Sequence, residues 1–160
     1  MAIHFKLMQQ YHGSHEEFDY FLVPTVKDKK PMADTVNTIR VLSSIGVPRQ
    51  KVRIVFNRVD VEDVIDTEFA PLFGLAELEK SFTLNPGAII YANEVFDRLK
   101  EVGKSLCEVS GDATDYRAKL RQARDDEERA FCLKMVAIKR LAITATKNLD
   151  GVFNTSFPAV

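Results

Sequence analysis

The chain of 160 residues has no tryptophan, only two cysteines and only three histidines. Cys107 and Cys132 stand far apart in no redox or metal-binding spacing, which favours free thiols in a reducing compartment over a disulfide framework. The histidines His4, His12 and His15 lack the i, i+4 spacing of a helical metal pair. No serine elbow or Cys/His dyad is present. The sequence therefore predicts neither a metal site nor a catalytic residue.

Long hydrophobic runs and an excess of one charge are also lacking. No stretch reaches the roughly 18 apolar residues of a membrane span, and the N-terminus lacks the pattern of a signal peptide. We therefore expect no membrane span and a cytoplasmic protein. The 22 basic and 23 acidic residues nearly balance, so no overall field attracts nucleic acid or membrane. The 46% of hydrophobic residues suffices for one ordinary globular core.

A strand, a helix and a second strand are predicted in the first part of the chain. Residues 20–23 form an unbroken apolar run ended by Pro24, which predicts a strand covered on both faces. Apolar residues recur at spacings of three and four over residues 31–45, which predicts an amphipathic helix that stops at Gly46. Residues 52–56 form the second strand. This succession has the size of a βαβ unit, whose strands pair in parallel.

The remaining chain is predicted to be mostly helical. Helical turns are expected over residues 5–11, and a helix over residues 62–80 that Pro71 and Gly74 interrupt. A third strand is expected over residues 88–91. One long helix or two should cover residues 116–148. Four of its side chains stand at core spacing: Phe131, Met135, Ile138 and Leu141. The tail after residue 157 is expected to fray.

The pentapeptide of residues 56–60 has the form of a base-recognition loop, because Asn57-Arg58-Val59-Asp60 follows an apolar strand. Ligands of parallel sheets bind at the carboxyl ends of the strands, which is where Asn57 and Asp60 are predicted to lie. Asn57 could pair with a purine edge, and Asp60 could accept hydrogen bonds from guanine. The alternative is a turn in which both side chains bind the backbone.

Basic residues give two further candidate surfaces. Lys27, Lys29 and Lys30 follow the first strand, where they could face a phosphate or a partner's carboxylates, or form a solvated loop. Nine basic residues in the C-terminal helices could hold DNA phosphates non-specifically or form an ion-paired, soluble helix face. They are Arg117, Lys119, Arg121, Arg124, Arg129, Lys134, Lys139, Arg140 and Lys147.

The segment Gly103-Lys104-Ser105 superficially matches the end of a phosphate-binding P-loop. The glycine that a P-loop requires five positions earlier is replaced by Arg98, and the segment follows a predicted helix instead of a strand. We therefore reject a P-loop at this position.

Together, residues 20–30, 43–48 and 52–60 resemble the ParA/MinD-type deviant-Walker partition ATPases, most closely the plasmid stability protein StbB group, which also includes conjugal transfer proteins. Residues 82–88, 116–121 and 148–153 extend the likeness over almost the whole chain. The resemblance implies a P-loop ATPase fold that binds ATP and Mg²⁺, dimerises around nucleotide and helps distribute plasmid DNA.

The same resemblance implies roles for individual residues. Asn57 would contact adenine, Asn93 would lie near the base from the second side, and Asp60 would brace the loop, with Arg58 between them. The implied fold class is α/β, with a partial P-loop NTPase-like (Rossmann-like) parallel sheet over residues 1–103. A helical C-terminal extension over residues 104–160 is expected to pack on it.

The family's strand with a glycine-rich loop, and its magnesium-positioning aspartate, have no counterpart in this chain, which resembles the C-terminal two-thirds. These parts supply nearly all of the machinery of phosphoryl transfer. We therefore expect ATP and Mg²⁺ to bind weakly or not at all, and no ATP hydrolysis by this chain alone.

The expected function is that of a truncated plasmid stability or partition ATPase-like protein, linked to segregation or conjugation. The expected partner is a second copy of the chain or another stability or transfer protein. Two alternatives remain open. One is a non-enzymatic interaction module that docks a partner through an exposed sheet edge and the C-terminal helices. The other is a GTPase-like remnant in which Asp60 reads guanine.

Overall fold

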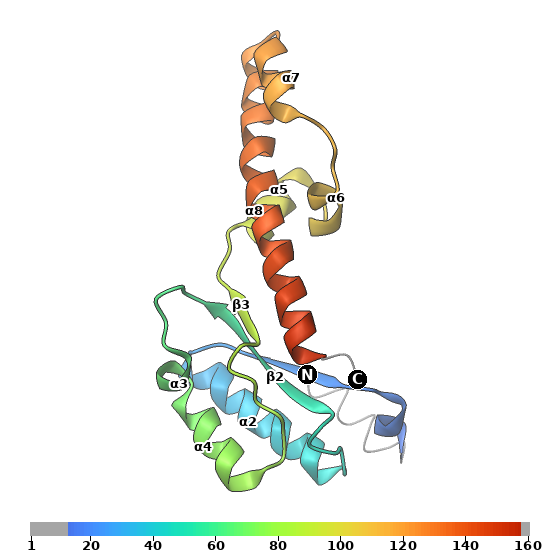
Figure 1. Ribbon diagram of the computed structural model, residues 1–160, viewed down its shortest axis with the longest axis vertical. Helices are drawn as coiled ribbons and strands as arrows, with labels where there is room; N and C mark the ends of the chain where they lie inside the picture. Colours follow the sequence, from blue (N-terminus) through green and yellow to red (C-terminus); the bar gives the residue numbers. More distant parts are fainter. Residues whose placement is uncertain (1–12, 158–160) are drawn as a thin grey trace. The chain divides into compact units, whose positions relative to one another are not determined.

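The computed structural model describes residues 13–157, which divide into two units (Figure 1). Of the described residues, 13–91 and 152–157 form the first unit, and Ala92–Gly151 form the second. The domain boundary predicted at residues 103 and 104 therefore falls inside the second unit. The predicted helical turns over residues 5–11 and the tail after residue 157 lie outside the described residues.

The first unit contains an open, three-stranded parallel sheet in the order β1-β2-β3 (Figure 1). Its strands are β1 (Phe21–Thr25), β2 (Val52–Val59) and β3 (Ile89–Tyr91). The register between β1 and β2 runs from Phe21 opposite Val52 to Thr25 opposite Phe56. The helix α2 (Lys29–Ser44) connects these two strands. The predicted βαβ unit and third strand are thus confirmed, and the sheet is compatible with a Rossmann-like fold.

Helix α2 follows the predicted periodicity closely. Its residues Met32, Ile39 and Leu42 are buried in the core of the first unit. The helix starts at Lys29, two residues before the predicted start, because a proline is tolerated in the first turn. After Ser44 the amide of Gly46 donates to the Ser43 carbonyl at 3.0 Å, and the next amide reaches the Leu42 carbonyl. Gly46 has a φ of 88°, so this glycine permits the turn that ends the helix.

The two faces of β1 differ, so the prediction that both are covered is wrong. Phe21 and Val23 pack into the core, whereas the Leu22 side chain is 49% exposed. Successive side chains of a strand point to opposite faces of the sheet, so Leu22 lies on the face away from this core. Among residues 13–157 only β2 pairs with β1, which makes β1 an edge strand. The strand also continues through Pro24 to Thr25. Prolines are tolerated on edge strands, where no ladder hydrogen bond need be lost.

The predicted helix after the second strand is two short helices. These are α3 (Ile65–Glu68) and α4 (Ala70–Glu79), which meet at Phe69. The Phe69 side chain is fully buried, and its ring centroid lies 4.7 Å from that of Phe56. Pro71 lies in the first turn of α4, and Gly74 lies within that helix. The predicted interruption at Gly74 is therefore wrong, and the chain breaks where an aromatic anchor enters the core.

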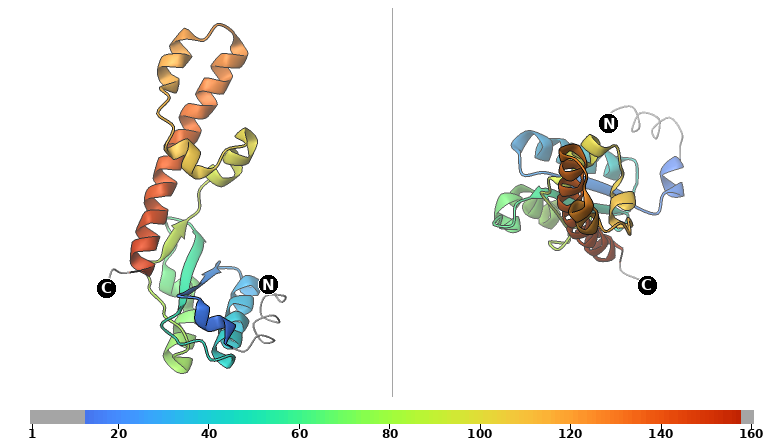
Figure 2. Two further views of the ribbon diagram at one scale, coloured as in Figure 1. Left: turned by 90° about the vertical axis from the view of Figure 1, so that its right-hand side faces the viewer. Right: turned by 90° about the horizontal axis from the view of Figure 1, so that it is seen from above.

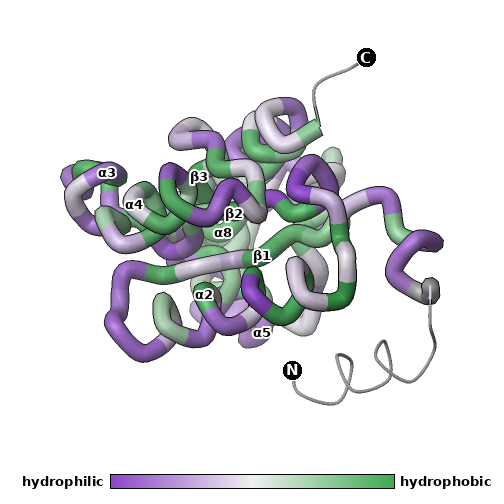
Figure 3. The backbone as a smooth tube through the Cα atoms, turned by 90° about the horizontal axis from the view of Figure 1, so that it is seen from below, coloured by the Kyte–Doolittle hydropathy of each residue, from purple (hydrophilic) through white to green (hydrophobic). Residues whose placement is uncertain are grey.

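The core of the first unit lies between the sheet and the helices α2, α3 and α4. It gathers the inward residues of β2, namely Val52, Ile54 and Phe56, with Leu72 and Leu75 of α4. Figure 3 shows the hydrophobic stretch of β1 between hydrophilic segments on either side. Burial of these side chains supplies the main driving force for this unit.

The opposite face of the sheet is polar and aromatic. There the guanidinium carbon of Arg53 lies 4.5 Å from the centroid of the Tyr20 ring and 6.0 Å from that of Phe157. The Tyr20 and Phe157 rings are themselves 4.8 Å apart at their centroids. Phe157 therefore belongs to the first unit through its contacts with Tyr20 and Arg53.

The second unit is helical and has its own core. It contains α5 (Val95–Val102), α6 (Leu106–Ser110), α7 (Tyr116–Gln122) and most of α8 (Asp126–Ser156). Figure 2 shows α7 alongside the beginning of α8. The core gathers mostly small and aliphatic side chains. They are Val95, Leu99, Val109, Tyr116, Cys132, Met135, Ile138, Ala142 and Ala145.

Of the two predicted arrangements of the C-terminal helices, the one with two helices is confirmed. The second helix extends to Ser156, well past the predicted end. Met135 and Ile138 are fully buried and Leu141 is partly buried, as their spacing predicts. Phe131 is 49% exposed, so its predicted core position is wrong. Its ring meets that of Tyr116 edge-on at 6.3 Å, which leaves the ring at the rim of the core.

Replacing Ile39 by alanine tests the first core. Its side chain is fully buried on α2, so the I39A variant should lose about 2–5 kcal/mol of unfolding free energy through the lost methyl groups and the cavity. Urea unfolding of the full chain measures this loss. The matched control is N37A on the exposed side of the same helix, for which we expect a change within about 0.5 kcal/mol. Equal effects of both variants would contradict this placement of the core.

Candidate nucleotide-type site at the carboxyl end of the sheet

The predicted recognition loop is largely part of a strand. β2 runs to Val59, so the expected end at Phe56 is wrong. The reason is pairing with β3, because Asn57 is opposite Ile90 and Val59 is opposite Tyr91, with a register shift between them. Arg58 is the residue left over, and its φ of 57° lies in the left-handed region. This bulge bends the strand just before Asp60.

A charged cluster closes this end of the sheet. The Lys27 Nζ donates hydrogen bonds to Asp60 Oδ2 at 2.8 Å and to Asp63 Oδ1 and Oδ2 at 3.0 and 2.9 Å. Asp63 Oδ2 also accepts a hydrogen bond from the backbone amide of Asp60 at 2.9 Å. The lysine comes from the segment after β1, and both carboxylates come from the segment after β2. The cluster therefore ties the ends of the two strands together.

The pKa values of the cluster reflect these contacts. The hydrogen bonds that Lys27 donates to Asp60 and then to Asp63 raise the pKa of Lys27 far above its ordinary value. The hydrogen bond from Lys27, followed by that from the Asp60 amide, lowers the pKa of Asp63. The ammonium group is thus held charged and is matched by two carboxylates, one of which, Asp63, has a side chain only 12% exposed. A lysine so occupied is a poor ligand for phosphate unless the cluster opens.

The other predicted basic residues lie apart from this cluster. Lys29 and Lys30 occupy the first turn of α2 and are exposed. Positive charges at this end of a helix are slightly unfavourable, because they face the positive end of the helix dipole. An approaching anion would relieve that repulsion, so their phosphate-facing or partner-facing role stays a prediction.

The structure places the predicted base-binding residues in two groups. Asn57 and Arg58 are neighbours at the end of β2, the first half-buried and the second exposed. Asp60 follows them within the cluster with Lys27. Asn93 belongs to the second unit, where its Oδ1 accepts a hydrogen bond from the Val95 amide at 2.9 Å at the start of α5. Asn93 therefore has a local structural role, and its approach to a base stays a prediction.

Two residues at this end of the sheet were missed by sequence reasoning. Asp63 is the more buried partner of Lys27, and the spacing Asp60-x-x-Asp63 after a strand was the available signal. Thr25 ends β1 and is 2% exposed, yet its Oγ1 has no hydrogen-bond partner among residues 13–157. A buried hydroxyl without a partner is costly, and such groups cluster at functional sites. No sequence pattern singles it out.

The segment Gly103-Lys104-Ser105 has a structural role in the second unit. Gly103 ends α5 with a φ of 62°. The Ser105 hydroxyl accepts a hydrogen bond from the Glu108 amide at 3.3 Å, and the Glu108 carboxylate in turn accepts from the Ser105 amide at 2.7 Å. This reciprocal pair is a capping box for α6. The segment therefore joins two helices, whereas a P-loop joins a strand to a helix.

Comparisons of the chain with protein-family models, curated proteins and solved structures give no match. Within residues 13–157 the side chains of His, Cys, Asp and Glu form no group of three or more that could hold a metal ion. In the same residues no helix is both long and apolar enough to span a membrane. The class is thus defined by architecture, as an α/β protein with a parallel sheet and a separate helical unit.

Replacing Lys27 by methionine tests the cluster. Because the Lys27 hydrogen bond is the main cause of the lowered pKa of Asp63, the K27M variant should raise that pKa towards or above the ordinary 3.8. Carboxyl carbon shifts followed by NMR against pH measure it. In the native chain the stabilising contribution of Asp63 is fully present above the ordinary pKa and is lost as the pH falls through the lowered one.

The control for this experiment is K29M, which removes a lysine of the same region that lies outside the cluster. It should leave the titration of Asp63 unchanged. An Asp63 pKa that is the same in K27M and in the native chain would show that the ion pair does not form in solution.

Proposed function

We propose that the chain is the base-binding part of a plasmid stability or partition ATPase-like protein and does not hydrolyse ATP alone. The observation that carries the proposal is the position of Asn57. It lies half-buried at the carboxyl end of the central strand of a parallel sheet. Ligands of such sheets bind at this end. The likeness of the surrounding residues to the ParA/MinD-type ATPases supports adenine as the base.

The absence of hydrolysis follows from what phosphoryl transfer needs. The reaction depends on a loop that cradles the phosphates, on magnesium ligands and on a group that positions water. Within residues 13–157 no glycine-rich loop follows a strand. Lys27, which lies at the carboxyl end of the sheet, is bound to Asp60 and Asp63. The described residues therefore offer a place for a base without a place for its phosphates.

The open edge of β1 is where the phosphate-binding part would add. β1 pairs with β2 on one side only within the described residues. A further parallel strand at this edge would place the loop that follows it at the same end of the sheet as Lys27 and Asn57. Thr25, with its buried and unbonded hydroxyl at the end of β1, would lie beside that loop. In this proposal, the phosphate-binding half of the site would lie at the open edge of β1.

A direct assay of the purified chain tests the enzymatic side of the proposal. With ATP and Mg²⁺ we expect phosphate release at the background rate, because the groups that stabilise the transferring phosphoryl are absent. The assay should compare the native chain with N57A. Robust magnesium-dependent turnover by the native chain would contradict the proposal.

In the cell, deletion of the gene should lower retention of the replicon that encodes it. The measurement is the fraction of cells that lose the replicon when they grow without selection.

The exposed apolar side chains of the first unit favour a second candidate, a non-enzymatic interaction module. Leu22 on the edge strand is 49% exposed, and Tyr20 and Phe153 are also exposed on this unit. An unpaired strand edge beside exposed apolar groups is a common site of strand addition. In this candidate the chain docks a second copy or another stability or transfer protein through β1.

A charge on β1 tests the interaction candidate. We expect the native chain to self-associate and the L22E variant to be monomeric, because a buried carboxylate at such a contact costs several kcal/mol. Size exclusion with light scattering measures the state. The control is L78E on α4, a leucine that is 84% exposed and lies away from β1. A native chain that stays monomeric at low and high salt would remove this candidate.

A further inference from the structure

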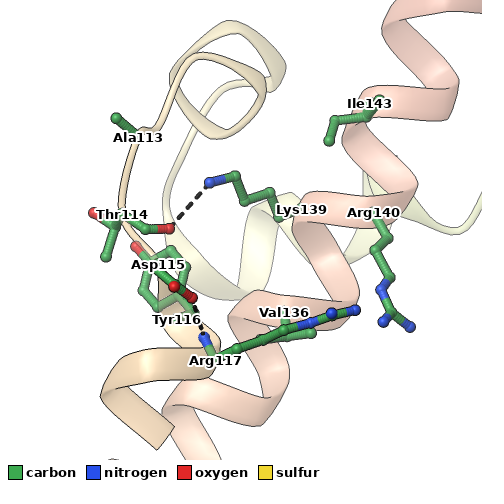
Figure 4. Close-up of a pocket in the computed structure, with 9 residues that line it drawn as sticks. All are labelled: Ala113, Thr114, Asp115, Tyr116, Arg117, Val136, Lys139, Arg140 and Ile143. Carbon is green, nitrogen blue, oxygen red and sulfur yellow. Dashed lines mark hydrogen bonds between the residues drawn. The ribbon is translucent and has the colours of Figure 1, made fainter.

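The second unit contains a cavity that the sheet and its site do not involve. It has a volume of about 310 Å³ and lies where the start of α7 faces the middle of α8 (Figure 4). Its charged lining comes from Asp115, Arg117, Lys139 and Arg140. The volume is at the lower end of the range of small-molecule sites.

Two of the four charged groups are already committed to the protein. The Asp115 carboxylate accepts hydrogen bonds from the amides of Arg117 and Ala118, both at 3.0 Å, and so caps α7. These bonds lower the pKa of Asp115, which keeps it ionised. The Lys139 Nζ donates to the Thr114 carbonyl at 3.0 Å, drawn as a dashed line in Figure 4. The cap therefore occupies the helix amides, and a ligand must use other groups.

The two guanidinium groups are the uncommitted charges. Neither Arg117 nor Arg140 forms an ion pair with a carboxylate among residues 13–157. Both are exposed, and Figure 4 shows the Arg117 side chain extending across Val136 towards that of Arg140. Two like charges that point at one another repel, and an anion between them would relieve the repulsion. Guanidinium groups bind carboxylate and phosphate through paired hydrogen bonds.

The rest of the lining combines the aliphatic side chains of Ala113, Val136 and Ile143 with Thr114 and Tyr116. Val136 is half-buried, and Ile143, about two turns further along α8, is 43% exposed. The cavity thus has a cationic side and an aliphatic side. This combination fits a small organic anion with a non-polar body better than a bare inorganic ion.

We propose that this cavity binds a small organic anion, whose carboxylate or phosphate lies between Arg117 and Arg140 and whose apolar body covers Val136 and Ile143. Carboxylate and phosphate share the chemistry that the guanidinium groups recognise. The site is independent of the nucleotide-type site, because all of its residues belong to the second unit.

Calorimetric titration of the full chain at low salt tests the site with three probes: phenyl phosphate, benzoate and inorganic phosphate. We expect one equivalent of phenyl phosphate or benzoate to bind. The probe that binds more tightly shows whether the site prefers a phosphate or a carboxylate. Inorganic phosphate should bind at least several-fold more weakly than phenyl phosphate. If neither aromatic probe binds, the proposal is wrong. If inorganic and phenyl phosphate bind equally, the apolar part of the site is wrong.

Variants locate the binding. R117Q and R140Q should each weaken binding of the aromatic probe by about tenfold or more, because each removes a charge-assisted hydrogen-bonding group. The matched controls R121Q on α7 and R129Q on α8 change arginines outside the lining and should leave affinity within about twofold. An equal loss of affinity in the controls and in the test variants would show that the probe is held by diffuse charge attraction. That result would overturn the assigned site.

One further variant has the opposite expected sign. D115N keeps a good helix cap and removes the only carboxylate of the lining. It should tighten binding of the anionic probe by about two- to fivefold. Weaker binding in D115N, with helicity unchanged by circular dichroism, would contradict an anion site at this position.

Discussion

Pairing of β2 on both of its edges is the interaction on which the first unit depends. Its backbone joins β1 in register on one side and β3 on the other. Phe56 of β2 makes two kinds of contact. Its amide donates to the Ala88 carbonyl at 2.9 Å, and its fully buried ring contacts the ring of Phe69. One residue thus links the hydrogen-bonded sheet to the packed helices. Val52, Ile54 and Val59 of the same strand also combine a paired backbone position with nearly complete burial.

The candidate site is a consequence of the same pairing. Because β2 pairs with β3 as far as Val59, the strand extends beyond its apolar run. Asn57 and Arg58 therefore lie at the carboxyl end of the sheet. The bulge at Arg58 then allows Asp60 to turn towards Lys27. Charge compensation at this end removes the free lysine that a phosphate would need. In the function that we propose, this end of the sheet would bind a base without the groups that phosphoryl transfer needs.

Much of the fold could be predicted from the sequence because its signals are local. The helix over α2 is marked by apolar periodicity and by Gly46, and the strands by short apolar runs. What could not be predicted depends on neighbours far along the chain. Leu22 is exposed because it lies on the face of β1 away from the core, and the extension of β2 follows from its pairing with β3. The Lys27 cluster also joins residues that are separated by more than thirty positions, so the lysine run alone did not reveal its partners.

Hydrogen exchange at the backbone amides of β2 tests the central claim most directly. The amides of Ile54 and Phe56 donate to the carbonyls of Thr83 and Ala88, in the segment that precedes β3. If β2 is the central strand on which the unit depends, these amides should exchange only on global unfolding and rank among the slowest of the first unit. Exchange of the Ile54 and Phe56 amides as fast as that of exposed loop amides would contradict the parallel sheet, and with it the site at its carboxyl end.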